Sequence, residues 1–500
     1  MTILKNMNDM TRRANRLAGT AAALAAAMLL TACATHRDIG SSAVLRAPAD
    51  YESAATLAGA GGAWPGLSWA ADIGGSALQE LIDEALVQNP GIRSAAARVA
   101  AARAMAEAAG AAGQPLAGGT FNSTWQRYTE NGLVPRPLAG SRETDNRLTL
   151  DFSYDLDLWG RHAAEQRAAL SQEKAADAEQ QAVRIGLSTA IARAWVQLAR
   201  QEAQLSLLAR QIEVRQELDR LTRLRVAAGL DSRSENEQAR QQLATLRAEQ
   251  AQWQEAQQLT RNQLAALLGQ GPDRGQRIVA PVLPAAASAA LPAQLPLGLL
   301  GRRPDIVAAR WRVEAAQGDI DSARAQFYPN INLVAFAGFS SLGLSNLLAG
   351  GSQVAGVGPA VRLPLFESGG LRAQLKGRVA SHEGAVAAYN QALTDALHEV
   401  ADQLQSLRAA AVQQEQLLAA SQAAASSLEH VRRRERAGTA NRLPVLAAEM
   451  TLLTQQRAEL DSRARRADLD IGLIRALGGG FSDAGAGADM NKNIATYSAS

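Results

Sequence analysis

The sequence predicts a mostly α-helical fold with membrane β-strands, built as a duplicated repeat of two strands plus long coiled-coil helices. Three observations support this prediction. The two halves of the chain share the same proline spacing, and runs of alternating polar and apolar residues follow each proline pair. Long proline-free stretches, rich in helix-forming residues, come after those runs.

The first 32 residues have the pattern of a signal peptide. Basic side chains precede an apolar run from Leu17 to Leu30, which is short for a membrane-spanning helix. The run ends in a Leu-Thr-Ala-Cys sequence whose last residue, Cys33, is the only cysteine, so an intramolecular disulfide is excluded. This ending resembles a bacterial lipobox and predicts lipidation of Cys33; the alternative is an ordinary secretory signal with an incidental cysteine. Because Ala34 and not aspartate follows, the resemblance favours the outer membrane.

The charge of the chain gives no indication of a nucleic-acid partner. Residues 1–32 hold four basic side chains and one acidic side chain, which accounts for the whole net charge of +3. No later segment has eighteen consecutive apolar residues, so a mature chain that crosses a membrane must do so with strands in a closed barrel.

Paired prolines mark one helix in each half. Pro90 and Pro115 are 25 residues apart, and so are Pro304 and Pro329. Proline suits the first turn of a helix and stops a helix elsewhere. Each pair is therefore expected to bracket a helix of about six turns.

Strands are predicted after each of these helices. Apolar residues alternate with polar residues from Leu148 to Leu158, and three of the polar positions are Asp151, Asp155 and Asp157. In a soluble sandwich the apolar face would pack on a second sheet. In a membrane barrel it would face lipid, and the three aspartates would line the water-filled lumen.

The second half repeats this hairpin pattern. Strands are expected around 331–335 and 361–365, with a glycine- and serine-rich hairpin tip from Ser340 to Gly358; the first tip is expected from Thr129 to Arg142. The aromatic residue after the first hairpin, Trp159, either lies at a membrane interface or packs in an ordinary turn.

Two very long helices follow the hairpins. The stretches from Arg161 to Ala228 and from Leu371 to Ala437 contain no proline and would each extend roughly 100 Å as helix. Each turns back at a glycine with an arginine four residues earlier, and glycine is the expected residue just beyond a helix end. The predicted layout is a signal peptide 1–32, a lipidated N-terminus and first repeat 33–270 (hairpin about 116–159, helices about 161–268), a linker 271–296, a second repeat 297–478 (hairpin about 329–366, helices about 371–477) and a flexible tail 479–500.

The sequence contains no candidate catalytic or metal centre. Its five histidines are scattered without metal-ligand spacing, and no glycine-rich phosphate loop of the Walker type is present. We expect no cofactor and no enzymatic activity.

Several motifs together resemble one family over roughly residues 65–478. They are Asn89-Pro90, the Arg-Arg-Pro-Asp-Ile segment at 302–306, Phe-Tyr-Pro at 327–329, Pro-Leu-Phe at 364–366, the paired tip glycines and Cys33. These motifs look like the TolC-type outer-membrane efflux family. Within it the best fit is the lipidated branch serving resistance-nodulation-division multidrug pumps, the OprM/NodT type.

The resemblance implies an assembly and its partners. Three chains would form a homotrimer with a twelve-stranded β-barrel in outer-membrane lipid, continued by a periplasmic α-barrel. A periplasmic adaptor (membrane fusion) protein and an inner-membrane resistance-nodulation-division pump would complete a tripartite exporter. The expected function is a passive exit duct for drugs and other small molecules. The alternatives are a duct for one-step protein secretion and a coiled-coil scaffold that forms no channel.

The resemblance also places a gate at the helix tips. In many relatives, aspartates on the second return helix surround the aperture, and matching by the tip glycine puts those positions at Pro444 and Ala447, where this chain has no carboxylate. Pro444 also fits a first-turn proline. Basic residues crowd the tip, and we expect them to dock an adaptor or to pair with Glu235, Glu237 and Glu435 between protomers. The alternative is an ordinary solvated charged surface. The candidate tip and gate residues are Arg225, Gly229, Ser234, Arg434, Gly438, Arg442, Pro444 and Ala447.

Overall fold

The computed structural model describes residues 38–53, 55–57, 62–283, 295–364 and 368–483. The predicted signal peptide and Cys33 lie outside these residues. The contacts divide the chain into two units. The first comprises Met1–Leu45, Ala100–Lys174 and Arg310–Ala388, and the second comprises Arg46–Val99, Ala175–Ala309 and Tyr389–Ser500.

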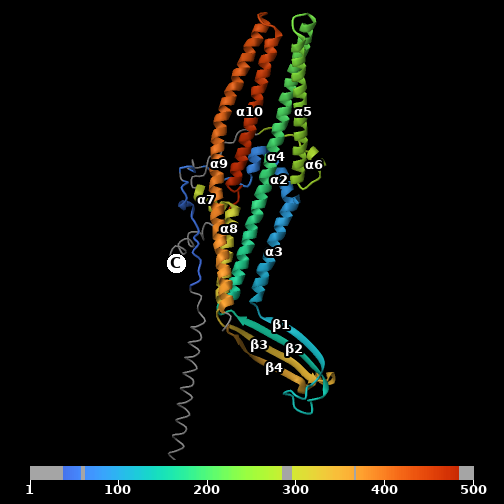
Figure 1. Ribbon diagram of the computed structural model, residues 1–500, viewed down its shortest axis with the longest axis vertical. Coiled ribbons are helices and arrows are strands. Elements are labelled where there is room, and N and C mark those ends of the chain that lie inside the picture. The colour runs from blue at the N-terminus through green and yellow to red at the C-terminus, as the bar shows by residue number, and fades with distance from the viewer. Residues whose placement is uncertain (1–37, 54, 58–61, 284–294, 365–367, 484–500) are drawn as a thin grey trace, which may run out of the picture. The chain divides into compact units, whose positions relative to one another are not determined.

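The first unit contains a four-stranded antiparallel sheet (Figure 1). Its strands are β1 (Leu116–Arg127), β2 (Arg142–Leu156), β3 (Asn330–Leu342) and β4 (Gln353–Arg362). The strands pair in chain order, so each half of the chain supplies one hairpin and β2 pairs with β3 between the halves. The two predicted hairpins are confirmed.

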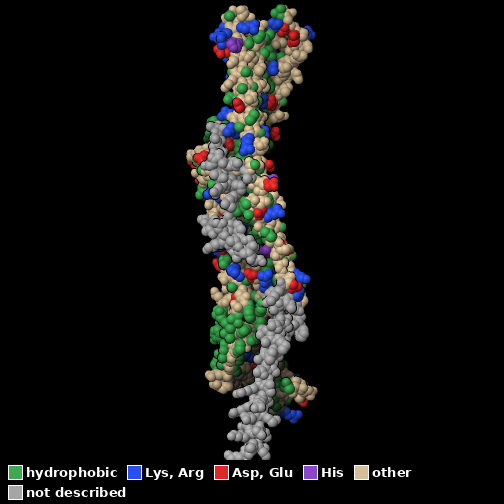
Figure 2. All heavy atoms as spheres, turned by 90° about the vertical axis from the view of Figure 1, so that its left-hand side faces the viewer, with side chains coloured by type: hydrophobic (Ala, Val, Ile, Leu, Met, Phe, Trp, Pro, Cys, Tyr) green, Lys and Arg blue, Asp and Glu red, His purple; other side chains and the backbone are tan. Residues whose placement is uncertain are grey.

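Strand β2 of this sheet has one apolar and one polar side. The exposed fraction is 59% for Leu150 and 49% for Phe152, whereas Thr149 between them is only 3% exposed. Directly paired residues of antiparallel strands lie on one face, so Phe121 of β1, Leu148 of β2 and Phe339 of β3 share the apolar side. The period-two prediction therefore holds, and apolar side chains gather at the level of the strands in Figure 2.

Three details of the strand predictions are wrong. The second hairpin tip is shorter than 340–358, because β3 continues to Leu342 and β4 begins at Gln353, where ladder pairing overrides the weak strand preference of glycine. Leu363 lies beyond the end of β4, and residues 365–367 lie outside the described residues. Asp157 lies beyond the end of β2, in a turn.

The predicted helices begin where the prolines place them. α3 spans Pro90–Ala112 and α8 spans Pro304–Ala325, each starting at the first proline of its pair. The long helices are α4 (Arg161–Ala227) and α9 (Ser368–Arg436), with 67 and 69 residues. In the first unit, Ile39 of the N-terminal segment is buried with Phe327 and with Leu375 of α9.

The second unit adds the return helices α5 (Arg233–Leu267) and α10 (Arg442–Ala476) and the shorter α2 (Trp69–Gln88). Its main core joins apolar side chains of α2, α4, α5 and α10. Toward the tips, α4 packs on α5 through one apolar cluster and on α10 through another. These clusters are Leu208, Ile212 and Leu243, and Val214, Leu446 and Leu453. None of the helices in the described ranges has an apolar stretch long enough to span a membrane.

Part of the predicted linker is structured. It contains α6 (Pro272–Gln276), and Ile278 is buried in the main core. Helix α7 (Leu295–Arg302) follows the undescribed residues 284–294. At the other end, the Asp483 amide donates to the Gly301 carbonyl (2.9 Å), so the described start of the predicted tail contacts the second repeat.

In both repeats, the residue before the proline that begins a helix donates a side-chain hydrogen bond to the end of the return helix. Asn89 Nδ2 donates to the carbonyl of Leu267, the last residue of α5 (2.8 Å). Arg303 Nη1 donates to the carbonyl of Ala476, the last residue of α10 (3.1 Å), and also pairs with Glu399 at 2.7 Å. This contact explains why the Arg-Arg-Pro-Asp-Ile motif contains a buried arginine.

Candidate functional site at the helix tips

The turn between α4 and α5 reverses the chain at a glycine. Gly229 has φ +72°, a conformation that favours glycine. The Leu230 amide donates to the Arg225 carbonyl at 2.8 Å, and the Gly229 amide donates to the Val226 carbonyl at 3.0 Å. These two bonds form the Schellman pattern, which satisfies the last carbonyls of a helix.

The turn between α9 and α10 has the same geometry. Gly438 also has φ +72°, and the Thr439 amide donates to the Arg434 carbonyl at 2.9 Å. The arginine that precedes each glycine by four residues therefore contributes its carbonyl oxygen to the turn. Its side chain is free to take a different role in each turn.

The return helices begin with different caps. The Ser232 hydroxyl accepts from the Glu235 amide, and the Glu235 carboxylate accepts from the Ser232 amide at 2.6 Å, a capping box. Asn441 caps α10 by accepting from the Leu443 amide at 3.1 Å. Ser234, the predicted tip serine, lies exposed in the first turn of α5. The Ser-x-x-Glu spacing could have identified Ser232 from the sequence.

Ion pairs within the chain use most of the acidic residues of the tip. Arg225 donates twice to Asp231, each bond at 2.8 Å, and these bonds hold the pKa of Asp231 below its usual value. Glu435 pairs with Arg442 at 3.5 Å, and Arg432 pairs with Glu449 at 3.4 Å. The carboxylates expected to lock neighbouring protomers are thus engaged locally, as are Glu235 in its cap and Glu237 with Arg240.

Arg434 differs from its counterpart Arg225. Its side chain is exposed and makes no hydrogen bond or ion pair with any residue that the structure describes. Figure 2 shows further Lys and Arg side chains gathered around the helix ends. The tip thus presents at least one guanidinium to an external carboxylate.

The two positions expected to hold aspartates lie on the exposed side of α10. Pro444 is in the first turn, and Ala447 lines a groove of about 370 Å³ between α4 and α10. Arg215 of α4 lines the same groove, and burial lowers the pKa of its guanidinium. No local sequence signal distinguishes Arg215 from the other arginines of α4, and we did not predict it.

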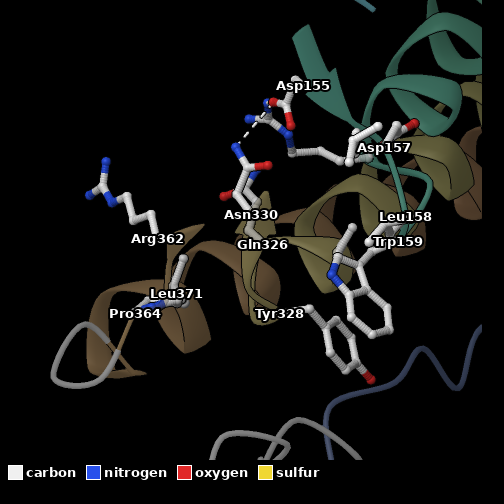
Figure 3. A pocket seen from close by; sticks show the side chains of 13 residues that line it. Asp155, Asp157, Leu158, Trp159, Gln326, Tyr328, Asn330, Arg362, Pro364 and Leu371 are labelled. Atoms are coloured by element: carbon white, nitrogen blue, oxygen red, sulfur yellow. Dashed lines mark hydrogen bonds and ion pairs between the residues drawn. The ribbon is translucent and has the colours of Figure 1, made fainter. Parts of the chain in front are cut away.

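The predicted lumen aspartates have specific local contacts. Asp155 Oδ2 accepts hydrogen bonds from Asn330 (3.0 Å) and Arg161 (3.1 Å) at the junction of strands and helices (Figure 3). It also accepts from His162 (3.1 Å) when that ring nitrogen carries the proton. Asp157 accepts from the Ala163 amide at 2.9 Å, so it caps the start of α4 and lies outside the strand. Asp151 stays within β2 and accepts from the Thr149 hydroxyl at 3.1 Å.

The same junction contains an aromatic pair beside a hollow of about 290 Å³. The Trp159 and Tyr328 rings are stacked (Figure 3), with centroids 4.6 Å apart. The Trp159 indole donates to the Pro329 carbonyl at 2.8 Å. Trp159 thus packs in the turn as one of the two alternatives predicted. With 47% of its surface exposed, it also suits an interface.

Comparison with known proteins decides the family. The family described as "Outer membrane efflux protein" matches residues 81–270 and 295–479. The chain belongs to the outer membrane efflux protein family. One matched range lies in each half of the chain, and membership confirms both the expected family and its non-enzymatic character.

Individual outer membrane efflux proteins are similar over most of their length. The fusaric acid resistance protein FusA of Burkholderia cepacia is 37% identical over 71% of this chain and 68% of its own. The multidrug resistance outer membrane protein MdtP of Escherichia coli is 31% identical over 92% and 96%. The crystal structure of the outer membrane protein VceC from Vibrio cholerae has 38% identity and a TM-score of 0.77, covering 84% of this chain and all of that one. The expected fold is therefore confirmed.

Proposed function

We propose that this chain forms the outer-membrane exit duct of a tripartite efflux system for drugs and other small molecules. The observation that carries the proposal is the four-stranded sheet. Its strand β2 alternates exposed apolar and polar side chains, and the sheet continues into helices of 67 and 69 residues. Membership of the efflux family and similarity to a multidrug resistance outer membrane protein support it. The duct is passive, so a partner supplies the energy.

A homotrimer would complete the channel. β1 and β4 are the two edges of the sheet, and each has only one neighbouring strand in a single chain. Unpaired strand edges are not tolerated in lipid, so three copies would close the edges into a twelve-stranded barrel. Asp151 and Asp155 would then face the lumen.

Lipidation of Cys33 would add an anchor in the outer membrane. The first described residues support this placement, because Asp38 pairs with Arg372 at 2.7 Å near the start of α9. The rest of the helices would extend into the periplasm.

The tips would form the gate and meet the adaptor and the resistance-nodulation-division pump. The exposed side chain of Arg434 and the basic surface around it suit an acidic partner surface. Because Pro444 and Ala447 carry no charge, closure would rest on packing and on the ion pairs of Arg442 and Arg432.

A deletion strain tests the function. We expect several-fold lower inhibitory concentrations of unrelated drugs after deletion, restored by the native gene. Loss of a secreted protein with unchanged drug susceptibility would instead indicate a protein secretion duct, and no change in either would indicate a scaffold.

The Arg434→Glu variant tests the tip. We expect weaker pump assembly or antibiotic leakage, while Arg408→Glu, an exposed change elsewhere on α9, behaves like the native protein. Unchanged resistance and unchanged leakage in Arg434→Glu would exclude a role for this side chain.

A further inference from the structure

One guanidinium joins three helices in the second unit. Arg457 of α10 donates from Nε to Gln204 Oε1 (2.8 Å) and from Nη1 to Gln211 Oε1 (3.1 Å), both on α4. It also pairs with the Glu249 carboxylate on α5. These four residues are called the Arg457 cluster here.

The Arg457 cluster joins two buried glutamines to a partly exposed ion pair, since 19% of the Arg457 side chain and 32% of the Glu249 side chain are exposed. Gln204 is 0% exposed and Gln211 is 3% exposed, and Gln204 Nε2 donates in return to the Arg457 carbonyl at 3.2 Å. The bonds from Arg457 hold the pKa of Glu249 below its usual value, so Glu249 stays ionised. A shift of α10 along α4 would leave the buried amides of Gln204 and Gln211 unpaired, so these hydrogen bonds favour one register.

Three members of the Arg457 cluster, one on each helix, lie at one level. Arg457 follows the tip glycine Gly438 by 19 residues, Glu249 follows Gly229 by 20, and Gln211 precedes Gly229 by 18. At 1.5 Å per residue this level is roughly 30 Å from the tips. Gln204 precedes Gly229 by 25, so it lies about two turns further from the tip on α4.

The packing of α4 against α10 differs between the two sides of the Arg457 cluster. Between the Arg457 cluster and the tip, α4 and α10 meet through the apolar contacts of Val214, Leu446 and Leu453, beside the open groove at Arg215. Apolar contacts are non-directional and allow helices to shift. Away from the tip, α4 and α10 enter the main core, and Arg303 holds the end of α10.

We infer that the Arg457 cluster is the pivot of the gate: it holds α10 on α4 and α5, and opening moves only the helix segments between this level and the tips. The inference rests on the proposed function, because it presumes a gated tip. Arg457 acts as a positioning residue, since it lies about 30 Å from the aperture.

Conductance of the full-length protein in planar bilayers tests the inference. Arg457→Gln should raise the open fraction several-fold. Arg457→Lys should lie between it and the native protein, because lysine keeps the charge but its compact ammonium lacks the planar fork of the guanidinium. Arg463→Gln is the matched control, an exposed arginine six residues further along α10. It should behave like the native protein.

Thermal melting of the same samples separates gating from folding. If Arg457→Gln does not fold, Glu249→Gln retains the side-chain shape, removes the charge and should raise the open fraction less but in the same direction. An open fraction in folded Arg457→Gln or Glu249→Gln equal to that of Arg463→Gln would overturn the inference. A native protein that forms no conducting channel would instead count against the proposed function.

Discussion

Arg303 donates a 3.1 Å hydrogen bond to the carbonyl oxygen of Ala476, 173 positions later in the chain. The first repeat contains the equivalent contact between Asn89 and Leu267. In both repeats the donor precedes the proline that begins a helix, and the acceptor is the last residue of the return helix. The two repeats thus form the same contact at equivalent positions, and its donor is a neutral amide in the first repeat and a charged guanidinium in the second.

Replacement of Arg303 should lower the free energy of unfolding. Arg303 is 8% exposed and donates to Asp305, Glu399 and the Ala476 carbonyl, so Arg303→Met leaves the buried carbonyl and two partly exposed carboxylates without this donor. We expect a loss of about 3 kcal/mol in the free energy of unfolding. Denaturant titration of the purified protein measures it.

Arg302→Met is the control for this change. The Arg302 guanidinium lies over the Trp64 ring at 4.9 Å and makes no other interaction with a described residue, so its loss should cost less than about 1 kcal/mol. Equal losses in the two variants would contradict the assigned role of Arg303.

The glycine after α10 and the glycine after α9 should differ in how well they tolerate replacement by alanine. Gly478 has φ +90°, and an added Cβ would lie 1.9 Å from the Arg302 carbonyl oxygen, so Gly478→Ala should reduce the yield of folded protein severely. Gly438 has φ +72° with nothing within 4 Å of an added Cβ, so Gly438→Ala should cost only about 1 kcal/mol. Thermal melting and yield check both, and similar behaviour of the two variants would rule out the steric explanation.

The serine that caps α5 should slow the hydrogen exchange of amides in the first turn of that helix. Ser232→Ala removes one side of the capping box and should weaken the first turn of α5 by about 1 kcal/mol. Ser234→Ala, two residues further on, removes no cap. Hydrogen exchange of the amides at 233–236 should speed up in Ser232→Ala only, and faster exchange in both variants would contradict the assignment.

The buried carboxyl of Asp470 should make stability depend on pH. Burial raises the pKa of Asp470 to about 6, from 3.8, although the charge of Arg466 acts in the opposite direction. A raised pKa means that this contribution to stability is complete below about pH 4 and lost as the pH rises through 6. The charged form costs on the order of 3 kcal/mol.

Asp470→Asn tests this dependence. The variant should melt at a higher temperature than the native protein at pH 7.5, and the difference should vanish near pH 4. Asp468→Asn is the control, because Asp468 is half exposed and pairs with Arg193 at 3.3 Å, so no stabilisation is expected. An unchanged difference across this pH range would disprove the raised pKa.

The sequence by itself determined the repeat, the strands and the tip turns. Proline positions, alternation around Leu150 and the glycines at 229 and 438 are local signals, because backbone geometry depends on neighbouring residues. Short local sequence patterns also identified the family motifs. It also explains the errors at the strand ends, where ladder pairing with distant strands decides the boundary.

Only the tertiary structure decided which polar residues meet inside the helix bundle. Arg457 and Gln204 are 253 positions apart, and nothing in the local pattern around either residue indicates the contact. Arg215 and Ala447 share a groove for the same reason. Side chains on different helices are brought together by helix packing, and a buried polar group is stable only where a partner from another helix satisfies it.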